Sequence, residues 1–375
     1  MSPAFSISTS TWPASAHMLE TVFSHSSEIS KIERCDSIIN NMEGGKQSLQ
    51  LRYYFADRDT AEESSVVLDS DGKILYLDYF DKLYGLDRYR TSVLVDEIPF
   101  EFVDNKIILS IQLNENSRVL RLLFDTGSDG MAVDKLLADS LGLVITRQQS
   151  ASMVGGNLNI SISSGNTVHV GDKAILKNRN IGVFEYDHGG LDGILGLTLA
   201  NNYIVNVDFD RSVIGLYSFG DFHYEKDAKI VPIKSSGVAL IPGRLNLTGE
   251  SEVDGNFIFD TGAGFNLVCF EDFVRKNRLL LSGFKYESVG SMAGIGHNTA
   301  IYNGKATTFS MGDGVVLKKQ MPVTLQASNG KGNWNMKESG SLGIKFIANY
   351  NFTINLVDKV IAFQERNSLS FNPRK

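Results

Sequence analysis

Hydrophobic residues along most of this chain fall in short runs of about four to eight positions, a pattern typical of strands. Residues 106–113 form one clear run, and a polar turn at residues 114–117 leads into a second run at residues 121–124. We predict a hairpin here. Residues 204–209 and 213–217 predict a second strand pair, again joined by a polar turn.

The order of these segments repeats in the second half of the chain. Residues 257–259 and 266–268 take the places of residues 122–124 and 131–133, at an offset of 135 residues. Further along, Gly196 corresponds to Gly343 at an offset of 147. Insertions therefore fall between the matching segments and not inside them. We predict a β-rich lobe that occurs twice.

Two segments have helical spacing. Between Glu28 and Met42 the apolar residues lie as on one face of a helix, which we expect to end at Gly44-Gly45. Residues 134–141 predict a short helix of the first lobe. Its expected apolar face consists of Leu136, Leu137 and Leu141.

The chain before the first lobe has its own pattern. Residues 1 to about 26 are rich in Ser and Thr, and we expect a mobile arm there. Together with the predicted helix, short strands form a small α+β extension. It could be a propeptide that covers the active site or an extension that only packs against the lobes, and no cleavage motif favours the propeptide. The predicted strands are residues 48–55, 66–68 and 73–79. We place the domains at residues 1–97, 98–225 and 226–375.

Composition excludes some classes of protein. The 375 residues carry a formal net charge of −7, which argues against a nucleic-acid binder or a polybasic membrane-surface protein. Two cysteines cannot form a disulfide framework. No apolar run is long enough to cross a membrane. No signal peptide is visible, which slightly favours a cytoplasmic location over a periplasmic or secreted one from which a leader was removed.

One motif occurs in both lobes. An apolar strand runs directly into Asp125-Thr126-Gly127-Ser128 in the first lobe and into Asp260-Thr261-Gly262-Ala263 in the second. Downstream of each lies a second signature, Ile194-Leu195-Gly196 and Ser341-Leu342-Gly343. An isolated Asp-Thr-Gly is usually only a turn. Two copies, each followed by the second signature, indicate a shared site.

With these paired signatures the chain resembles the aspartic proteases of the pepsin and retropepsin clan, in a bacterial-type form with two fused retropepsin-like lobes. The resemblance covers residues 98 to about 370. It implies a mostly β, two-lobed acid-protease fold of β-barrels. The extension is left unexplained. Two residues depart from the family pattern. Ser341 stands where an apolar residue is expected, and Gly264 stands where the first lobe has Asp129. There is also no flap tyrosine of the pepsin type.

The resemblance implies chemistry based on two carboxyl groups. Asp125 and Asp260 are the expected catalytic pair, in which one carboxyl is protonated and the other is a base that activates water. The glycine of each Asp-Thr-Gly would allow a tight loop that presents the carboxylate. The threonine of each would form hydrogen bonds across the interface between the lobes. Ser128 can bond Asp125, whereas Ala263 cannot do so for Asp260. The residues expected to support the pair are Thr126, Gly127, Ser128, Thr261, Gly262 and Ala263.

Other expectations concern substrate and regulation. In retroviral relatives an Asp at the position of Asp129 holds the substrate backbone, and glycines at two corresponding places are candidates for mobile flaps. Those glycines are Gly155, Gly156, Gly294 and Gly296. We expect a peptide or protein substrate, no metal or organic cofactor, and a monomer. Two alternatives stay open: a non-catalytic peptide-binding protein that retains the fold, and a latent protease inhibited by its N-terminal segment.

Overall fold

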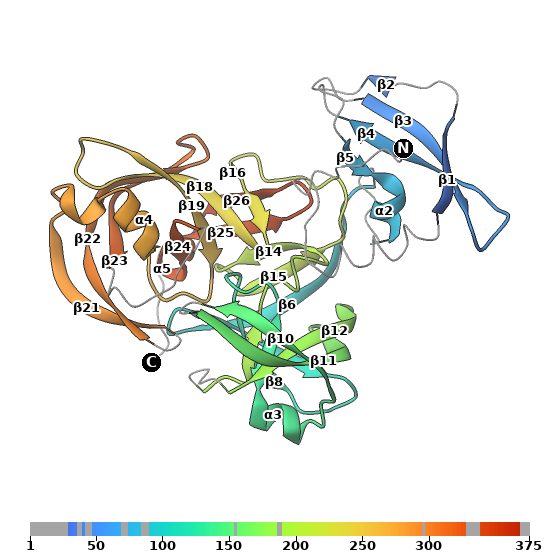
Figure 1. Cartoon of the computed structure of the whole chain (residues 1–375), viewed down its shortest axis with the longest axis horizontal. Coiled ribbons are helices and arrows are strands. Elements are labelled where there is room, and N and C mark those ends of the chain that lie inside the picture. The colour runs from blue at the N-terminus through green and yellow to red at the C-terminus, as the bar shows by residue number, and fades with distance from the viewer. Residues whose placement is uncertain are drawn as a thin grey trace. The chain divides into compact units, whose positions relative to one another are not determined.

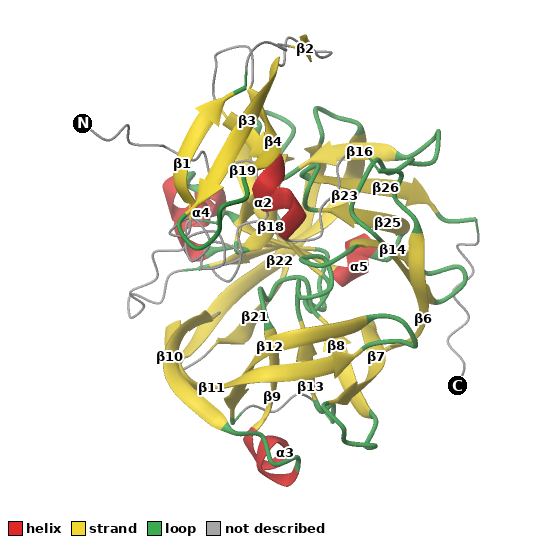
Figure 2. Cartoon of the chain, turned by 90° about the vertical axis from the view of Figure 1, so that its right-hand side faces the viewer, coloured by secondary structure: helices red, strands yellow, loops and turns green. Residues whose placement is uncertain are grey.

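The protein is mostly β, as Figure 2 shows. The computed structural model describes residues 29–35, 40–41, 47–68, 74–83, 90–153, 156–185, 190–294, 297–327 and 338–367. Helices in these ranges are short: α2 (Asp78–Leu83), α3 (Lys135–Ser140), α4 (Glu271–Lys276), α5 (Ile344–Ile347) and the 3₁₀ turn η2 (Leu279–Leu281). Among the described helices, none has the length and apolar character needed to cross a membrane.

The chain divides into two compact units. One contains residues 1–93 with 218–223 and 356–359, and the other contains the remaining residues. The first unit has a sheet of order β1-β3-β4-β5, with β2 beside β3. Tyr53 stacks on Tyr79 in its core, with ring centres 4.9 Å apart. The strands are β1 (Ile29–Arg34), β2 (Asn40–Asn41), β3 (Gln47–Phe55), β4 (Glu62–Leu68) and β5 (Ile74–Leu77).

The predicted helix between Glu28 and Met42 is wrong. Residues 29–34 form strand β1, which pairs antiparallel with β3 so that Ile29 lies opposite Phe55. Helical spacing over a short window is a weak signal, and pairing with a strand about 20 residues away overrides it. The hydroxyl of Tyr54 donates a hydrogen bond of 2.7 Å to Glu33 and fixes this register further. The predicted end of the helix at Gly44-Gly45 lies outside the described residues.

The predicted strands of this unit are otherwise confirmed. Strands β3 and β4 cover the expected segments, and β4 and β5 pair antiparallel as a hairpin. The expected last strand ends early, because α2 begins at Asp78.

The first lobe contains two tightly interlocked signatures. Strand β13 lies between β8 and β9, parallel to β8 and antiparallel to β9. This arrangement brings the second signature beside the strand that carries the first. The strands of this lobe are β6 (Leu94–Val103), β7 (Lys106–Leu113), β8 (Leu120–Phe124), β9 (Met131–Asp134), β10 (Ile145–Met153), β11 (Gly156–His169), β12 (Ile175–Phe184), β13 (Gly193–Leu195), β14 (Ile204–Asp208) and β15 (Val213–Tyr217).

The second lobe repeats the same order, as the sequence predicts. Strand β24 is parallel to β19 and antiparallel to β20, and α4 occupies the place of α3. The strands are β16 (Lys229–Pro232), β17 (Lys234–Ser236), β18 (Val238–Asn246), β19 (Val253–Asp260), β20 (Leu267–Cys269), β21 (Tyr286–Gly294), β22 (His297–Met311), β23 (Val316–Gln326), β24 (Gly340–Gly343), β25 (Tyr350–Asn355) and β26 (Val360–Glu365).

A shared sheet joins the lobes. Its order is β6-β15-β14-β25-β26-β16, so β14 of the first lobe pairs antiparallel with its own counterpart β25 (Figure 1). Asn206 lies opposite Thr353, the residue at the matching position of the second lobe, and their side chains hydrogen bond at 2.9 Å. The two lobes are therefore related by an approximate two-fold axis through this pair.

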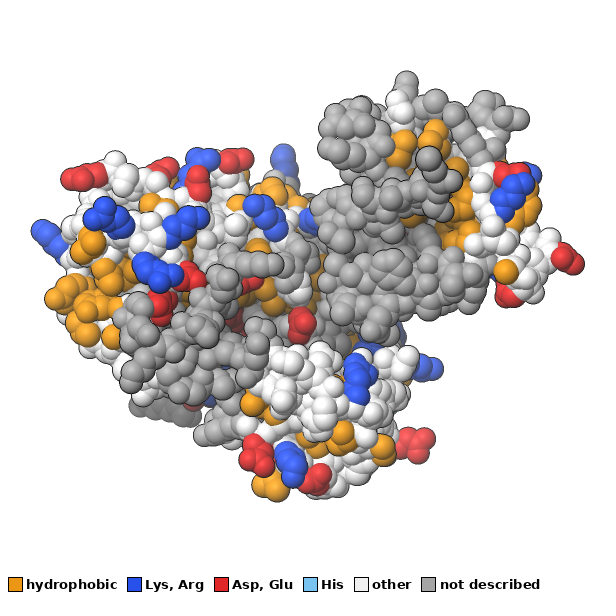
Figure 3. All heavy atoms as spheres, in the orientation of Figure 1, with side chains coloured by type: hydrophobic (Ala, Val, Ile, Leu, Met, Phe, Trp, Pro, Cys, Tyr) orange, Lys and Arg blue, Asp and Glu red, His pale blue; other side chains and the backbone are white. Residues whose placement is uncertain are grey.

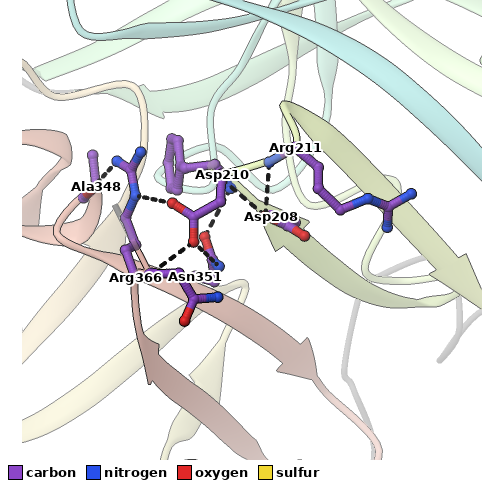
Figure 4. Close-up of polar contacts among 8 residues, drawn as sticks. Asp208, Asp210, Arg211, Ala348, Asn351 and Arg366 are labelled. Atoms are coloured by element: carbon purple, nitrogen blue, oxygen red, sulfur yellow. Dashed lines mark hydrogen bonds and ion pairs between the residues drawn. The ribbon is translucent and has the colours of Figure 1, made fainter. Parts of the chain in front are cut away.

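A polar cluster fastens the chain end to the same sheet (Figure 4). Asp210, in the turn after β14, accepts hydrogen bonds from Arg366 Nε at 3.0 Å, Asn351 Nδ2 at 3.1 Å and the Asn367 amide at 3.0 Å. Arg366 also donates to the Ala348 carbonyl at 2.9 Å. Its side chain is 9% exposed and that of Asp210 14%. A nearly buried ion pair thus joins the first lobe to the end of the second.

The predicted apolar face of α3 is only partly correct. Leu137 is buried, but Leu136 is 78% exposed. Leu136 instead lies in the first turn, where its amide donates to the capping side chain of Asp134 at 2.8 Å. Exposed hydrophobic side chains also occur on the second lobe, where Figure 3 shows them gathered over β21 and β22. Tyr286 and Val289 of β21 are among them.

Candidate active site

Asp125 and Asp260 lie at matching places in the two lobes. Asp125 follows strand β8 directly, and Asp260 is the last residue of β19. In each lobe the second signature holds the loop that follows. The Gly196 amide donates to the Gly130 carbonyl at 2.9 Å, and the Gly343 amide donates to the Asn266 carbonyl at 2.9 Å.

The glycine of the second signature is required by space. A Cβ atom at Gly196 would lie 2.3 Å from the Gly130 oxygen, and one at Gly343 would lie 2.3 Å from the Phe265 oxygen. Any side chain there would push the Asp-Thr-Gly loop away. This close contact explains why the second signature follows the first in both lobes.

Four reciprocal hydrogen bonds lock the two loops together. The Thr126 amide donates to Thr261 Oγ1 at 3.0 Å, and the Thr261 amide donates to Thr126 Oγ1 at 3.0 Å. Each hydroxyl in turn donates to a main-chain carbonyl of the other lobe at 2.6 Å, Thr126 to Phe259 and Thr261 to Phe124. Both threonines are fully buried. The cross-lobe threonine contact expected from the resemblance is present in the structure.

The two carboxyl groups face each other across this lock. Each accepts a main-chain amide of its own loop: Gly127 donates to Asp125 Oδ1 at 2.9 Å, and Gly262 donates to Asp260 Oδ1 at 3.0 Å. The glycines serve a second purpose that the sequence does not reveal. A Cβ at Gly127 would lie 2.6 Å from the Asp260 carboxyl carbon, and one at Gly262 would lie 2.4 Å from that of Asp125. Each glycine therefore makes room for the opposite carboxyl group.

The hydroxyl groups around the pair differ from the expectation. The Ser128 hydroxyl donates to the Gly130 carbonyl at 3.3 Å instead of bonding Asp125. Asp260 is the carboxyl that receives a hydroxyl, since Ser341 Oγ donates to its Oδ2 at 2.8 Å. Parallel pairing of β24 with β19 places Ser341 there. The expected asymmetry between the carboxyls is thus present but reversed, and the one sequence signal for it was a serine at an otherwise apolar position.

The surroundings disfavour two negative charges. Burial raises the pKa of both Asp125 and Asp260 above the ordinary carboxyl value. The charge of Asp260 raises the pKa of Asp125 further, while the Gly127 amide acts in the opposite direction. Hydrogen bonds from Ser341 and from the loop amides act to lower the pKa of Asp260. A pair in this setting holds one proton to higher pH than an isolated carboxyl does.

The remaining candidate residues lie at the edges of the site. The exposed Asp129 has its Oδ2 3.9 Å from the position of a Cβ at Gly237, in the second lobe. Gly156 pairs with Met153 where β10 turns into β11, and Gly294 pairs with His297 where β21 turns into β22. These two glycines therefore lie at hairpin ends. The other two, Gly155 and Gly296, lie outside the described residues.

No group of three or more potential metal ligands is found among the described residues. The groups that the structure brings together at this site are two half-buried carboxyls and the hydrogen-bond donors around them.

Comparison with known proteins gives one family match. Residues 109–199, which span β8, the first Asp-Thr-Gly and the second signature, match the model of an aspartyl protease family. The solved structure of an aspartic proteinase from Irpex lacteus is similar to 74% of this chain and 98% of its own, at 14% identity and a TM-score of 0.48. No curated protein matches in sequence. Residues 109–199 thus confirm the resemblance of this mostly β chain to the aspartic protease clan.

Proposed function

We propose that the chain is an aspartic endopeptidase whose catalytic pair is Asp125 and Asp260. The observation that carries this proposal is the joint geometry of the two loops. Two carboxyl groups from different lobes face each other, each within 2.6 Å of the place where a Cβ of the opposite glycine would lie, and a buried set of threonine hydrogen bonds holds their loops together. Burying two acids side by side is costly. A turn that served only the fold would gain nothing from that cost.

The proposed reaction needs one charged and one protonated carboxyl. The charged one takes a proton from a water molecule while the water oxygen bonds to the peptide carbonyl carbon, and the protonated one gives its proton to the carbonyl oxygen. The resulting gem-diol then returns a proton to the second carboxyl. The first carboxyl gives the proton it took to the amide nitrogen as the C–N bond breaks. One water is consumed, and the pair ends in its starting state.

The substrate in this proposal is an extended peptide that lies between the lobes. Strand-like main-chain hydrogen bonds would hold it. Hairpin ends that carry Gly156 and Gly294 would close over it, and Asp129 would contact its backbone. The expected cleft, the flaps and the monomeric state all stay predictions.

Hydrolysis of an unbiased peptide library tests the proposal. The parent protein, Asp125→Asn and Asp260→Asn are compared from acid to neutral pH, with Asp172→Asn as control because Asp172 is exposed and lies outside the two loops. We expect cleavage by the parent and the control, and a loss of at least 100-fold in both dyad variants. Full activity in either dyad variant would overturn the assignment.

The rival hypothesis is a peptide-binding protein without turnover. Such a protein would bind library peptides equally well with and without the two carboxyls and would release no products. An inactive parent that gains activity when residues 1–95 are removed would instead indicate the latent protease. Both alternatives are decided by the same library.

A further inference from the structure

The two carboxyl groups have nearly the same main-chain surroundings. Each accepts the amide of the glycine two residues further on, at 2.9 Å in the first lobe and 3.0 Å in the second. Each is half-buried and faces the other. Because these contributions match, they do not decide which of the two carries the proton.

Ser341 breaks the match. Its side chain is 2% exposed, and its hydroxyl donates a hydrogen bond to Asp260 Oδ2 at 2.8 Å. A buried hydroxyl needs an acceptor for its proton. Asp260 Oδ2 is that acceptor. The bond is stronger when Asp260 is charged, since hydrogen bonds to ions are roughly twice as strong as neutral ones, so it favours the charged form of Asp260.

Among the described residues of the first lobe, no hydroxyl donates to Asp125 as Ser341 does to Asp260. At the position that matches Ser341 stands Ile194, which packs against the hydrophobic cluster around Ile160. The nearby hydroxyl of Ser128 donates to the Gly130 carbonyl instead. Asp125 is therefore left without a hydroxyl group to stabilise its charged form.

We propose that Ser341 is a positioning residue that keeps Asp260 charged as the base and leaves the shared proton on Asp125. In the reaction, Asp260 takes the proton from water, and Asp125 gives its own to the peptide oxygen. The roles of base and acid rest on the proposed function. The preference of the proton for Asp125 does not, because it needs no substrate.

Electrostatics of the pair support this assignment. After burial, the hydrogen bond from Ser341 is the main influence on the pKa of Asp260 and lowers it, whereas the charge of Asp260 is the main influence on the pKa of Asp125 and raises it. The pKa values of Asp125 and Asp260 are set mainly by burial, by the opposite carboxyl group, and by hydrogen-bond donors from β24 and the two loops. No other charged side chain is among these main influences.

The first test needs no turnover. Asp125→Asn leaves Asp260 as the single carboxyl, and Asp260→Asn leaves Asp125; the pKa of the remaining acid is measured by carbon-13 NMR of labelled aspartate, with and without Ser341→Ala. We expect Ser341→Ala to raise the pKa of Asp260 by about one unit or more, since it removes a charge-assisted hydrogen bond, and to leave that of Asp125 unchanged. Equal shifts in both backgrounds, or none in either, would overturn the proposal.

The second test uses the pH profile of kcat/KM in the parent background. Ser341 stabilises Asp260 when charged. If the proton is on Asp125, both the active form and the fully ionised form contain that charge, so only the first ionisation depends on Ser341. Ser341→Ala then moves the acid limb to higher pH and leaves the alkaline limb in place. If the proton is instead on Asp260, the alkaline limb moves and the acid limb stays, which would refute the assignment.

Ser140→Ala is the control for both tests. It removes a hydroxyl that donates to the Leu137 carbonyl in α3, outside the two loops, and we expect it to leave the pKa values and both limbs unchanged. Ser341→Thr keeps the hydroxyl and should keep the parent profile. A parent that binds but does not hydrolyse peptides would defeat the proposed function and leave the NMR result standing, so the two failures are distinguishable.

Discussion

Replacing Asp210 with Ala should destabilise the protease lobes far more than the loss of an ordinary surface ion pair. Asp210 accepts three hydrogen bonds, and its partner Arg366 is 9% exposed. The variant leaves a nearly buried guanidinium without its counter-charge, a change that costs about 3 to 5 kcal/mol in buried pairs. Arg366 keeps its bond to the Ala348 carbonyl and its place over the Phe209 ring, 5.4 Å from the ring centre. We therefore expect about 3 kcal/mol, the lower end of that range.

Urea unfolding measures this change, with Arg211→Ala as the matched control. Arg211 is the next residue in the chain and forms an ion pair with Glu97. The Arg211 side chain is 61% exposed and that of Glu97 is 41% exposed. Exposed pairs of this kind contribute little to stability. With a denaturant slope of about 3 kcal/mol per molar, Asp210→Ala should lower the midpoint by about 1 M, and the control should lower it much less. Equal losses in the two variants would refute the reasoning.

The pH dependence of the same experiment gives an independent check. Burial acts to raise the pKa of Asp210, but hydrogen bonds from Asn367, Arg366 and Asn351 outweigh it and hold the pKa below the usual value. A lowered pKa in the folded state means that the stabilisation is present above the unfolded pKa of about 3.9 and is lost as the pH falls through the folded pKa. The difference between parent and variant should therefore shrink as the pH falls below about 3.9.

Three further predictions concern the candidate active site. Because the pKa of Asp125 is raised in the folded state, the carboxyl pair destabilises the fold as the pH rises above about 3.9. In thermal unfolding, Asp125→Asn should therefore be more stable than the parent by at least about 1 kcal/mol at pH 7 and should show no gain at pH 3. Thr261→Val leaves the buried Thr126 amide without an acceptor, and should cost about 2 to 4 kcal/mol in urea unfolding; a cost below 1 kcal/mol would contradict a locking role. Gly262→Ala places a Cβ 2.4 Å from the Asp125 carboxyl carbon and should lower kcat at least about 100-fold, whereas Gly264→Ala, with no atom within 4 Å, should keep parent activity.

Local motifs account for what the sequence could predict. Two short motifs occur in the sequence of both lobes. One is Asp-Thr-Gly after an apolar strand, and the other is the second signature, whose glycine packs against the Asp-Thr-Gly loop. The short apolar runs around these motifs predicted strands β7, β8, β14 and β15, because each run lies within a few consecutive residues. Each of these features depends on residues close together in the chain.

Features that depend on distant partners could not be predicted. Residues 29–34 form a strand because β3 pairs with them, and nothing within that window shows this. Ser341 looked like a departure from an apolar pattern, since its use depends on a carboxyl group 81 residues earlier. The ion pair of Asp210 with Arg366 spans 156 residues and has no local signature.

The cross-lobe threonine lock also sets an order of events during synthesis on the ribosome. Thr126 needs the Phe259 carbonyl, 133 residues downstream, and Thr261 needs the Phe124 carbonyl, 137 residues upstream. A nascent chain that has completed its first lobe therefore holds one acid and an unmatched half of the lock, and in our proposal it cannot cleave its neighbours. The second acid arrives with residue 260, and the hydroxyl beside it only with residue 341. Because both halves lie in one polypeptide, the site that we propose cannot form until the second lobe has been synthesised.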